Sequence, residues 1–363
     1  MPEAECGMNS SAIANNSMTT CLFGYSTSAD MDSETERIHW ISNLLWQIIG
    51  TTLLVIGLVG HLLSIVTTSA SSTLRSHSSG VFIVSLSIVG LLTLYSGLFR
   101  QVIMAFSSTG YDIRSRSIAG CKLHLFITYL SLQLFAWLQA TIALDRYIAV
   151  CHALYYNKFS RWVYGAGLVC VEVIVVMLLN SALLVSGKLS DTEHTYGIYC
   201  YTSIENLNMA WPYMDLLSFS IIPALFIIIF NCLILHNLIR RRNTNLKRHV
   251  KSLTVMLMTV NLAFLVSTVP ISIVLIMDLY QPIYHSARAE LGFTCTSILQ
   301  YTGTASTFFI YCLTGTRFRY KIKLIFSRKS VKQTLNAPNG NTRRRSTLDS
   351  QMDQCSNHNI QLK

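Results

Sequence analysis

The residues that could do chemistry are few in this 363-residue chain, and long apolar stretches separate them. His61, His124 and Glu172 lie in three different apolar segments, without the partner residues that acid–base or nucleophilic catalysis requires. The sequence contains no Cys-x-x-Cys pair, no Cys/His cluster at metal-ligand spacing and no glycine-rich phosphate loop. We therefore expect neither an enzyme nor a bound metal or cofactor.

A different kind of chemistry is indicated by Asp145 and Arg146, which are adjacent near the end of an apolar stretch and are followed by Tyr147. An ionisable residue inside an apolar span usually faces other protein segments and marks a functional site. The alternative is an arginine that extends along the lipid boundary to reach water. The first interpretation predicts an internal ion pair, and the second predicts an exposed guanidinium.

The elements that position these residues must be membrane helices. The chain is 51% hydrophobic and 12% charged, with a mean hydropathy of +0.43, whereas a soluble domain has about 25% charged residues. So much apolar surface requires lipid as part of the solvent. The net charge of +11 does not indicate nucleic-acid binding, because no recognised binding motif accompanies the basic residues.

Seven stretches have the length and apolarity of a membrane helix. They are Trp40–Thr68, Val81–Met104, Leu123–Val150, Val163–Val185, Met214–Leu238, Leu253–Leu279 and Leu291–Leu313. The second, third and seventh carry more Ser, Thr and Gln than a lone lipid-facing helix would, which predicts that the helices pack as a bundle.

The basic residues predict the orientation of the chain. With the first segment outside, seven of the 28 lysines and arginines lie outside, namely Arg37, Arg100, Arg114, Arg116, Lys122, Lys188 and Arg288. The other 21 lie inside, as the positive-inside rule requires. Possible glycosylation sites at Asn9 and Asn15 agree with an external amino terminus. We expect a multi-pass plasma-membrane protein with its amino terminus outside and its carboxyl terminus in the cytoplasm.

Several landmarks accompany Asp145-Arg146-Tyr147. They are Cys121 at the other end of the same span, Cys200 in the loop between spans four and five, Pro223 in span five, Phe264 and Pro270 in span six, Tyr311 at the end of span seven, and Phe318-Arg319 shortly after it. Over about residues 40–325, this constellation resembles the rhodopsin-like (class A) G-protein-coupled receptors, in a divergent form. The resemblance implies an all-α membrane protein: a seven-transmembrane-helix bundle with a short amphipathic eighth helix.

The resemblance also implies roles for particular residues. It assigns G-protein coupling and activation to Asp145, Arg146, Tyr147, Leu154, Pro223, Phe264, Pro270 and Tyr311. In the inactive receptor the arginine would pair with the adjacent aspartate, and on activation it would turn toward a heterotrimeric G protein. A disulfide would join the two landmark cysteines; two free thiols are the alternative. Leu154 could equally be an apolar residue that rests on the membrane surface.

The sequence departs from the family pattern in the middle of the spans. The usual Gly-Asn pair of span one is Gly60-His61, the buried aspartate of span two is Gly90, and a serine of span three is Phe135. Because a sodium ion needs several oxygen ligands including a charge, we expect no sodium site. His61 and Glu172 could supply compensating polarity, or they could pair locally and do nothing more.

The ligand candidates lie in the outer halves of the spans. They are Arg100, Gln101, Thr128, Gln133, Asp215, Asp278, Glu290, Phe293 and Tyr301. Three carboxylates near one mouth would suit a cationic peptide. In the alternative interpretation Arg100 only neutralises Asp278 or Glu290. The segment 94–101 resembles the end of the second helix in invertebrate-type neuropeptide receptors, so a neuropeptide ligand is favoured. The alternatives are a small organic ligand, or a receptor-like protein that does not signal or needs a partner.

The chain is predicted to divide into three parts. Residues 1–39 form an extracellular glycosylated segment, 40–326 the receptor domain with its amphipathic helix, and 327–363 a disordered cytoplasmic tail. The amphipathic helix would contact membrane lipids. The run Arg343-Arg344-Arg345-Ser346-Thr347 could be phosphorylated and then bind an arrestin, or match such a site by chance. A transporter or channel is less well supported, because Glu172 and Asp215 are isolated rather than paired.

Overall fold

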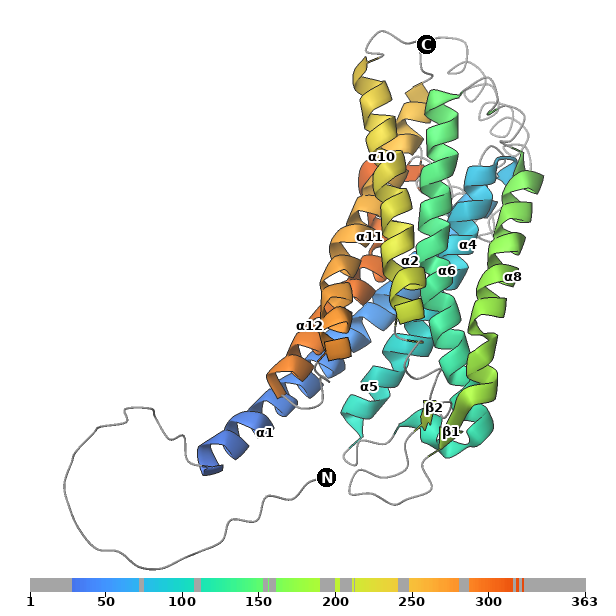
Figure 1. Ribbon diagram of the computed structural model, residues 1–363. Helices are drawn as coiled ribbons and strands as arrows, with labels where there is room; N and C mark the ends of the chain where they lie inside the picture. Colours follow the sequence, from blue (N-terminus) through green and yellow to red (C-terminus); the bar gives the residue numbers. More distant parts are fainter. Residues whose placement is uncertain are drawn as a thin grey trace, which may run out of the picture.

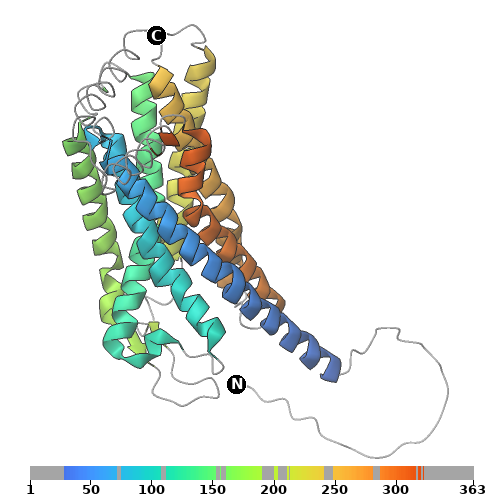
Figure 2. The ribbon, with the colours of Figure 1, turned by 180° about the vertical axis from the view of Figure 1, so that it is seen from behind.

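The structure is a computed structural model of an elongated bundle of helices (Figures 1 and 2). It describes residues 28–71, 75–107, 112–152, 156, 161–189, 200–202, 211, 213–240, 248–280, 287–315, 318–319 and 322. Six helices are long and apolar enough to cross a membrane: Ser33–Ser69, Ser78–Phe106, Ile118–Cys151, Trp162–Ser186, Tyr213–Arg240 and Ser252–Met277. These six agree with the first six predicted spans.

The elements follow one another in a simple order. They are α1 (Ser28–Leu45), η1 (Trp46–Gly50), α2 (Thr51–Ser69), α4 (Ser78–Thr93), η2 (Leu94–Leu98), α5 (Phe99–Phe106), η3 (Ile113–Arg116), α6 (Ile118–Cys151), α8 (Trp162–Ser186), β1 (Gly187–Leu189), β2 (Cys200–Thr202), η4 (Leu216–Ile221), α10 (Ile222–Arg240), α11 (Arg248–Tyr280), α12 (Ala287–Ala305) and α13 (Thr307–Thr314). The antiparallel strands β1 and β2 lie at one end of the bundle (Figure 1). We call this the disulfide end, after Cys121 and Cys200, and the opposite end the Arg146 end.

The seventh helix consists of α12 followed by α13, and it is less apolar than the other six. Backbone hydrogen bonds continue through Ser306, whose N–H donates to Thr302 and whose carbonyl accepts from Ile310. Its polar residues are buried against α1, α2 and α11 instead of facing lipid. The predicted seven-helix bundle is confirmed; among the described residues, six of its helices are continuous and apolar enough to be recognised as membrane spans, and the seventh is divided and more polar.

The helices around Pro223 and Pro270 differ in their backbone hydrogen bonding. Proline has no N–H to donate along a helix, and immediately before Pro223 the chain forms the wider π-helical turn η4. Pro270 lies inside α11, which continues as a helix on both sides of it. In the fifth span, an irregular π-helical turn therefore precedes the proline. In the sixth span, the α-helix continues through the proline without such a turn.

The central helix is α6, which contacts α4, α8, α10 and α11. Small residues let helices approach closely where lipid supplies no hydrophobic driving force between them. A Cβ at Gly303 of α12, for example, would overlap the hydroxyl of Ser267 on α11. Large apolar side chains such as Leu178, Val185 and Ile239 are 68–71% exposed, as a lipid-facing surface requires.

Candidate functional site

The Arg146 end contains a closed hydrogen-bond network around one buried guanidinium. Arg146 is only 1% exposed, although it lies near the end of α6. Its Nε donates to Asp145 Oδ2 at 3.0 Å, and its Nη2 donates to Ser79 Oγ at 2.6 Å and to the Tyr156 hydroxyl at 2.9 Å. Ser78 Oγ donates to the other oxygen of Asp145 at 2.8 Å. The arginine is therefore paired inside the protein, and the lipid-boundary alternative is wrong.

Aromatic rings also pack at the Arg146 end, one of them beside the guanidinium. The Tyr156 ring lies 5.7 Å from the guanidinium carbon, a cation–π distance. Tyr147 packs against Phe230 of α10 with ring centroids 5.5 Å apart. On the seventh helix, Tyr311 is fully buried and packs against Phe318 at 5.5 Å. These contacts place Tyr147 and Tyr311 where α6 and the end of the seventh helix meet their neighbours.

The middle of the bundle shows how the altered core residues fit together. Gly90 has no side chain, and the His61 ring fills its place: a Cβ at Gly90 would lie 2.5–2.6 Å from two ring atoms. Phe135 packs against Phe264, with the ring centroids 6.0 Å apart. Glu172 of α8 accepts a hydrogen bond from Thr141 of α6. His61 and Phe135 therefore fill by packing the positions where the family usually has polar residues. Glu172 has a local hydrogen-bond partner in Thr141.

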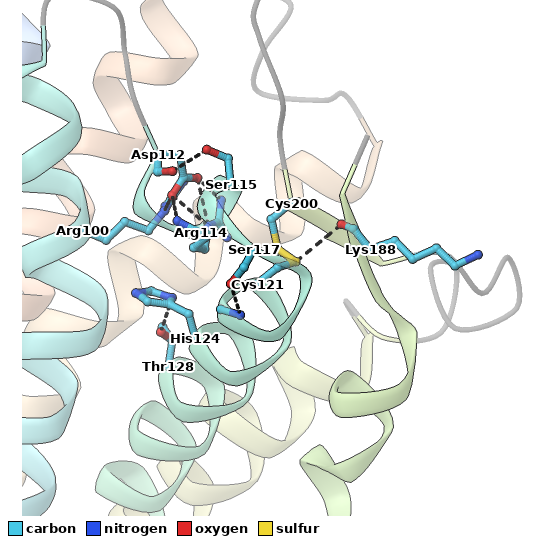
Figure 3. The surroundings of a disulfide bond; sticks show 11 residues. Arg100, Asp112, Arg114, Ser115, Ser117, Cys121, His124, Thr128, Lys188 and Cys200 are labelled. Atoms are coloured by element: carbon cyan, nitrogen blue, oxygen red, sulfur yellow. Dashed lines mark hydrogen bonds and ion pairs between the residues drawn. A yellow bond between two sulfur atoms is a disulfide. The ribbon is translucent and has the colours of Figure 1, made fainter. Parts of the chain in front are cut away.

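The disulfide end is closed by the predicted bond between Cys121 and Cys200, whose Cα atoms are 5.7 Å apart. Figure 3 shows how this bond ties the start of α6 to strand β2, next to Lys188 of strand β1. Both cysteines are buried. The disulfide predicted from the family resemblance is therefore present, and it links strand β2 covalently to the start of α6.

Beside the disulfide, two arginines share one carboxylate (Figure 3). Arg100 of α5 donates to Asp112 through Nε at 3.0 Å and Nη2 at 2.7 Å. Arg114 of η3 donates to the same carboxylate through Nε at 2.9 Å and Nη2 at 2.8 Å. Burial opposes the charge of Asp112, but the hydrogen bonds and charges of the two arginines outweigh it and hold its pKa well below the ordinary value. The alternative in which Arg100 neutralises Glu290 is wrong, because Glu290 lies beside His39; the side chain of Asp278 lies outside the described residues.

The arginine pair borders a cavity of about 200 Å³ between the helices at this end. Most of the predicted ligand residues line it, together with others that the sequence did not single out. The lining residues include Arg100, Gln101, Arg114, His124, Thr128, Tyr129, Asp215, Phe219, Phe293, Gln300 and Tyr301. The cavity is therefore bounded by η2, α5, η3, α6, η4, α11 and α12.

The remaining ligand candidates lie elsewhere. Gln133 is buried beside the cavity, where its Nε2 donates to Asp215 Oδ1 at 2.8 Å and its Oε1 accepts from Asn180 at 2.7 Å. Glu290 is half-exposed and lies 3.1 Å from His39 of α1, away from the cavity lining. Among the described lining residues Asp215 is the single carboxylate, so the expected cluster of three acids at one mouth is not formed.

Some predictions fall outside the described residues. These are the glycosylation sites Asn9 and Asn15, Leu154, the side chain of Asp278, and most of the amphipathic segment after Gly315. Conversely, the sequence interpretation missed the roles of Ser78, Ser79, Tyr156, Asp112 and Arg114. An aspartate two residues before an arginine is a weak signal, and the contacts of Ser79 with α6 depend on the tertiary fold.

Comparison with known proteins gives a consistent result. Residues 60–314 match the family described as 7 transmembrane receptor (rhodopsin family). The chain is 24% identical to the human C-C chemokine receptor type 8 over 84% of each chain, and 24% identical to the sheep melatonin receptor type 1A over 61% of this chain and 56% of that receptor. It is 25% identical to the Drosophila melanogaster protein trapped in endoderm-1 over 70% of this chain and 73% of the other.

Proposed function

This chain belongs to the rhodopsin family of seven-transmembrane receptors, and from that premise we propose that it transmits the binding of an extracellular peptide to a heterotrimeric G protein. Members of this family are receptors and not enzymes, and they are multi-pass membrane proteins. The proposed orientation places the amino terminus and the disulfide end outside and the carboxyl terminus in the cytoplasm. The distribution of lysine and arginine supports it.

The observation that carries this proposal is the buried network around Arg146. A guanidinium held by Asp145, Ser79 and Tyr156 is sequestered inside the bundle, and a buried charge is stable only while its partners remain in place. A rearrangement of α6 against α4 would break the bonds that Ser78 and Ser79 of α4 form with Asp145 and Arg146 and would weaken the hold on the guanidinium. The network therefore forms a two-state element that both a ligand and a G protein can bias.

The other activation residues lie along the path from the cavity to this network. Phe264 packs on α6 through Phe135, and Pro270 lies six residues further toward the cavity on α11. Ile271, the next residue, lines the cavity itself. We propose that Pro223, Phe264, Pro270 and Tyr311 transmit the movement, with Tyr147 and Leu154 at the G-protein contact.

Peptide recognition is the finer part of the proposal. The outer cavity holds both charged and aromatic side chains, which suits a terminal peptide residue better than a purely apolar ligand. A small organic ligand is the second candidate, because the human chemokine receptor and the sheep melatonin receptor to which the chain is similar are named for different kinds of ligand. A receptor-like protein that needs a partner subunit is the third.

The test is G-protein activation in cells that express the full chain, during a screen of a neuropeptide library. We expect a peptide to activate the wild type and Arg161→Ala, and to have no effect on Arg146→Ala at equal surface level. Arg161 is the matched control because it is an exposed arginine at the same end of the bundle. An Arg146→Ala receptor that signals as well as the wild type would contradict the proposal.

A further inference from the structure

Among the described residues at the disulfide end, the charges of one cluster do not balance. Two guanidiniums donate to both oxygens of the single Asp112 carboxylate, so this cluster carries one surplus positive charge. The backbone N–H of Arg114 also donates to Asp112 Oδ1 at 3.0 Å, which fixes the η3 turn in place. The surplus charge is therefore held on a rigid support, and it does not belong to a freely moving side chain.

This surplus charge faces the cavity. Arg100 and Arg114 both line it, whereas Asp112 does not, so the carboxylate lies behind the two guanidiniums. The two arginine side chains remain 17% and 18% exposed, against 11% for the aspartate. Among the described residues, nothing accepts a hydrogen bond from the Nη1 group of either arginine. Two forked donors are thus available to an acceptor inside the cavity.

The one acidic residue of the described lining does not compensate for this charge. Asp215 comes from the start of η4, on a different wall from Arg100 and Arg114, and its described partner is the amide of Gln133. Neither arginine forms an ion pair with it. The cavity therefore has a cationic side and a separate acidic side.

The other residues that line the cavity indicate what the uncharged part of a ligand must be like. Rings of Tyr129, Phe219, Phe293 and Tyr301 line the same cavity. A volume of about 200 Å³ is smaller than the 300–1,000 Å³ of drug-sized sites. It can hold one residue of a peptide, but not several.

We propose that the cavity binds the free carboxylate of a ligand's terminal residue, which the guanidiniums of Arg100 and Arg114 hold while its apolar side chain packs on the aromatic rings. The inference rests on the proposed receptor function and names the chemical class of its ligand. A peptide with a free carboxyl terminus fits, whereas the same peptide with an amidated terminus lacks the anion. This replaces the expectation of a cationic ligand, which relied on three carboxylates that the structure does not bring together.

The direct test is binding of two small probes to the purified full-length receptor in lipid nanodiscs. N-acetyl-L-phenylalanine carries a carboxylate next to an aromatic side chain, and N-acetyl-L-phenylalanine amide differs from it only in that group. We expect the acid to bind about tenfold more tightly than the amide, as a charge-assisted hydrogen bond implies. Ligand-observed NMR measures both dissociation constants.

Three variants show whether the arginine pair causes the preference. Arg114→Gln should make the acid and the amide bind equally, whereas Arg114→Lys, which keeps the charge without the fork, should retain part of the preference. Arg116→Gln is the matched control, because Arg116 is an exposed residue of the same η3 turn and does not line the cavity. Equal binding of acid and amide to the wild type would overturn the inference. So would a preference that survives Arg114→Gln, or no binding of either probe.

A cell assay separates this inference from the receptor function itself. A peptide library is prepared in two forms, with free and amidated carboxyl termini, and G-protein activation is measured for each. Activation by free-acid forms that is lost in Arg114→Gln supports both proposals. Activation by amidated forms alone overturns the carboxylate inference and leaves the receptor function standing. Acid-selective probe binding without activation by any peptide overturns the peptide-receptor proposal and leaves the inference intact.

Discussion

An arginine–aspartate cluster lies at each end of the bundle, but the two clusters differ in balance and in access. At the Arg146 end one guanidinium and one carboxylate meet, and a serine and a tyrosine complete the hydrogen bonds in a buried site. At the disulfide end two guanidiniums share one carboxylate beside a cavity. The first cluster is neutral and closed, so it can hold an inactive state, while the second has unused donors and charge for a ligand.

The covalent link at the disulfide end should give the largest effect when it is removed. Cys121→Ser opens a bond between residues 79 positions apart, and loss of such a bond typically costs about 2–5 kcal/mol. We expect a large fall in thermal stability and in surface expression. Cys170→Ser is the control, because Cys170 is an exposed free thiol of α8. Equal stability of the two variants would show that non-covalent contacts already hold this end together.

The interior between the two clusters should respond less strongly. In Gly90→Ala the new Cβ would collide with the His61 ring, and overpacking of this kind costs about 1–3 kcal/mol. His61→Ala in the same chain should recover part of that loss, because the colliding ring is gone. Thermal unfolding of the two single variants and the double variant measures the coupling. Additive losses would contradict the account in which His61 fills the space beside Gly90.

A single hydrogen bond tests how firmly the Arg146 end is closed. Tyr156→Phe removes the hydroxyl that accepts from Arg146 at 2.9 Å and keeps the ring beside the guanidinium. A hydrogen bond to a charged group contributes about 1.5–3 kcal/mol, so basal G-protein activation should rise about tenfold or more if the bond exists only in the inactive state. Tyr213→Phe, at an exposed residue of the fifth span away from the Arg146 end, is the control. An unchanged basal signal would mean that the hydroxyl is retained in both states.

The smallest effect concerns pH at the disulfide end. Burial disfavours the charged form of Asp112, but Arg100 and Arg114 more than offset this, so its folded pKa lies below the ordinary value of 3.8. A carboxylate with a lowered pKa contributes full stability above its unfolded pKa, and loses it only as the pH falls through the folded pKa. The stability difference between the wild type and Asp112→Asn should thus stay constant from about pH 7 to about pH 5. A difference that shrinks across this window would show that the arginines do not hold the carboxylate ionised.

The two ends also differ in how far the sequence predicted them. The Asp145-Arg146-Tyr147 run and the Cys121–Cys200 pair were recognisable because each combines residue type with position in a membrane span. The partners Ser79 and Tyr156 were not, since they come from segments 67 and 10 residues away and meet Arg146 only through packing. Asp112 likewise acquires its role from two arginines that the fold brings together.

The predicted cluster of acids was wrong for a similar physical reason. Asp215 and Glu290 were grouped by their place along the spans, but the first lines the cavity and the second contacts α1. Position along a helix fixes the depth of a residue in the membrane, whereas its direction depends on how the helices rotate and pack. The substitution of His61 for the usual residue could be seen in the sequence, while its fit beside Gly90 required the structure.

The most direct test of the central claim, that the closed network at the Arg146 end holds the receptor inactive, needs no ligand. G-protein activation is measured in cells that express the wild type, Asp145→Asn, and Asp145→Asn combined with Arg146→Ala, at matched surface levels. Loss of the carboxylate removes the ionic partner of Arg146, so Asp145→Asn should raise the basal signal several-fold, and the double variant should return to background. A basal signal unchanged by Asp145→Asn, or one that persists without Arg146, would contradict the account.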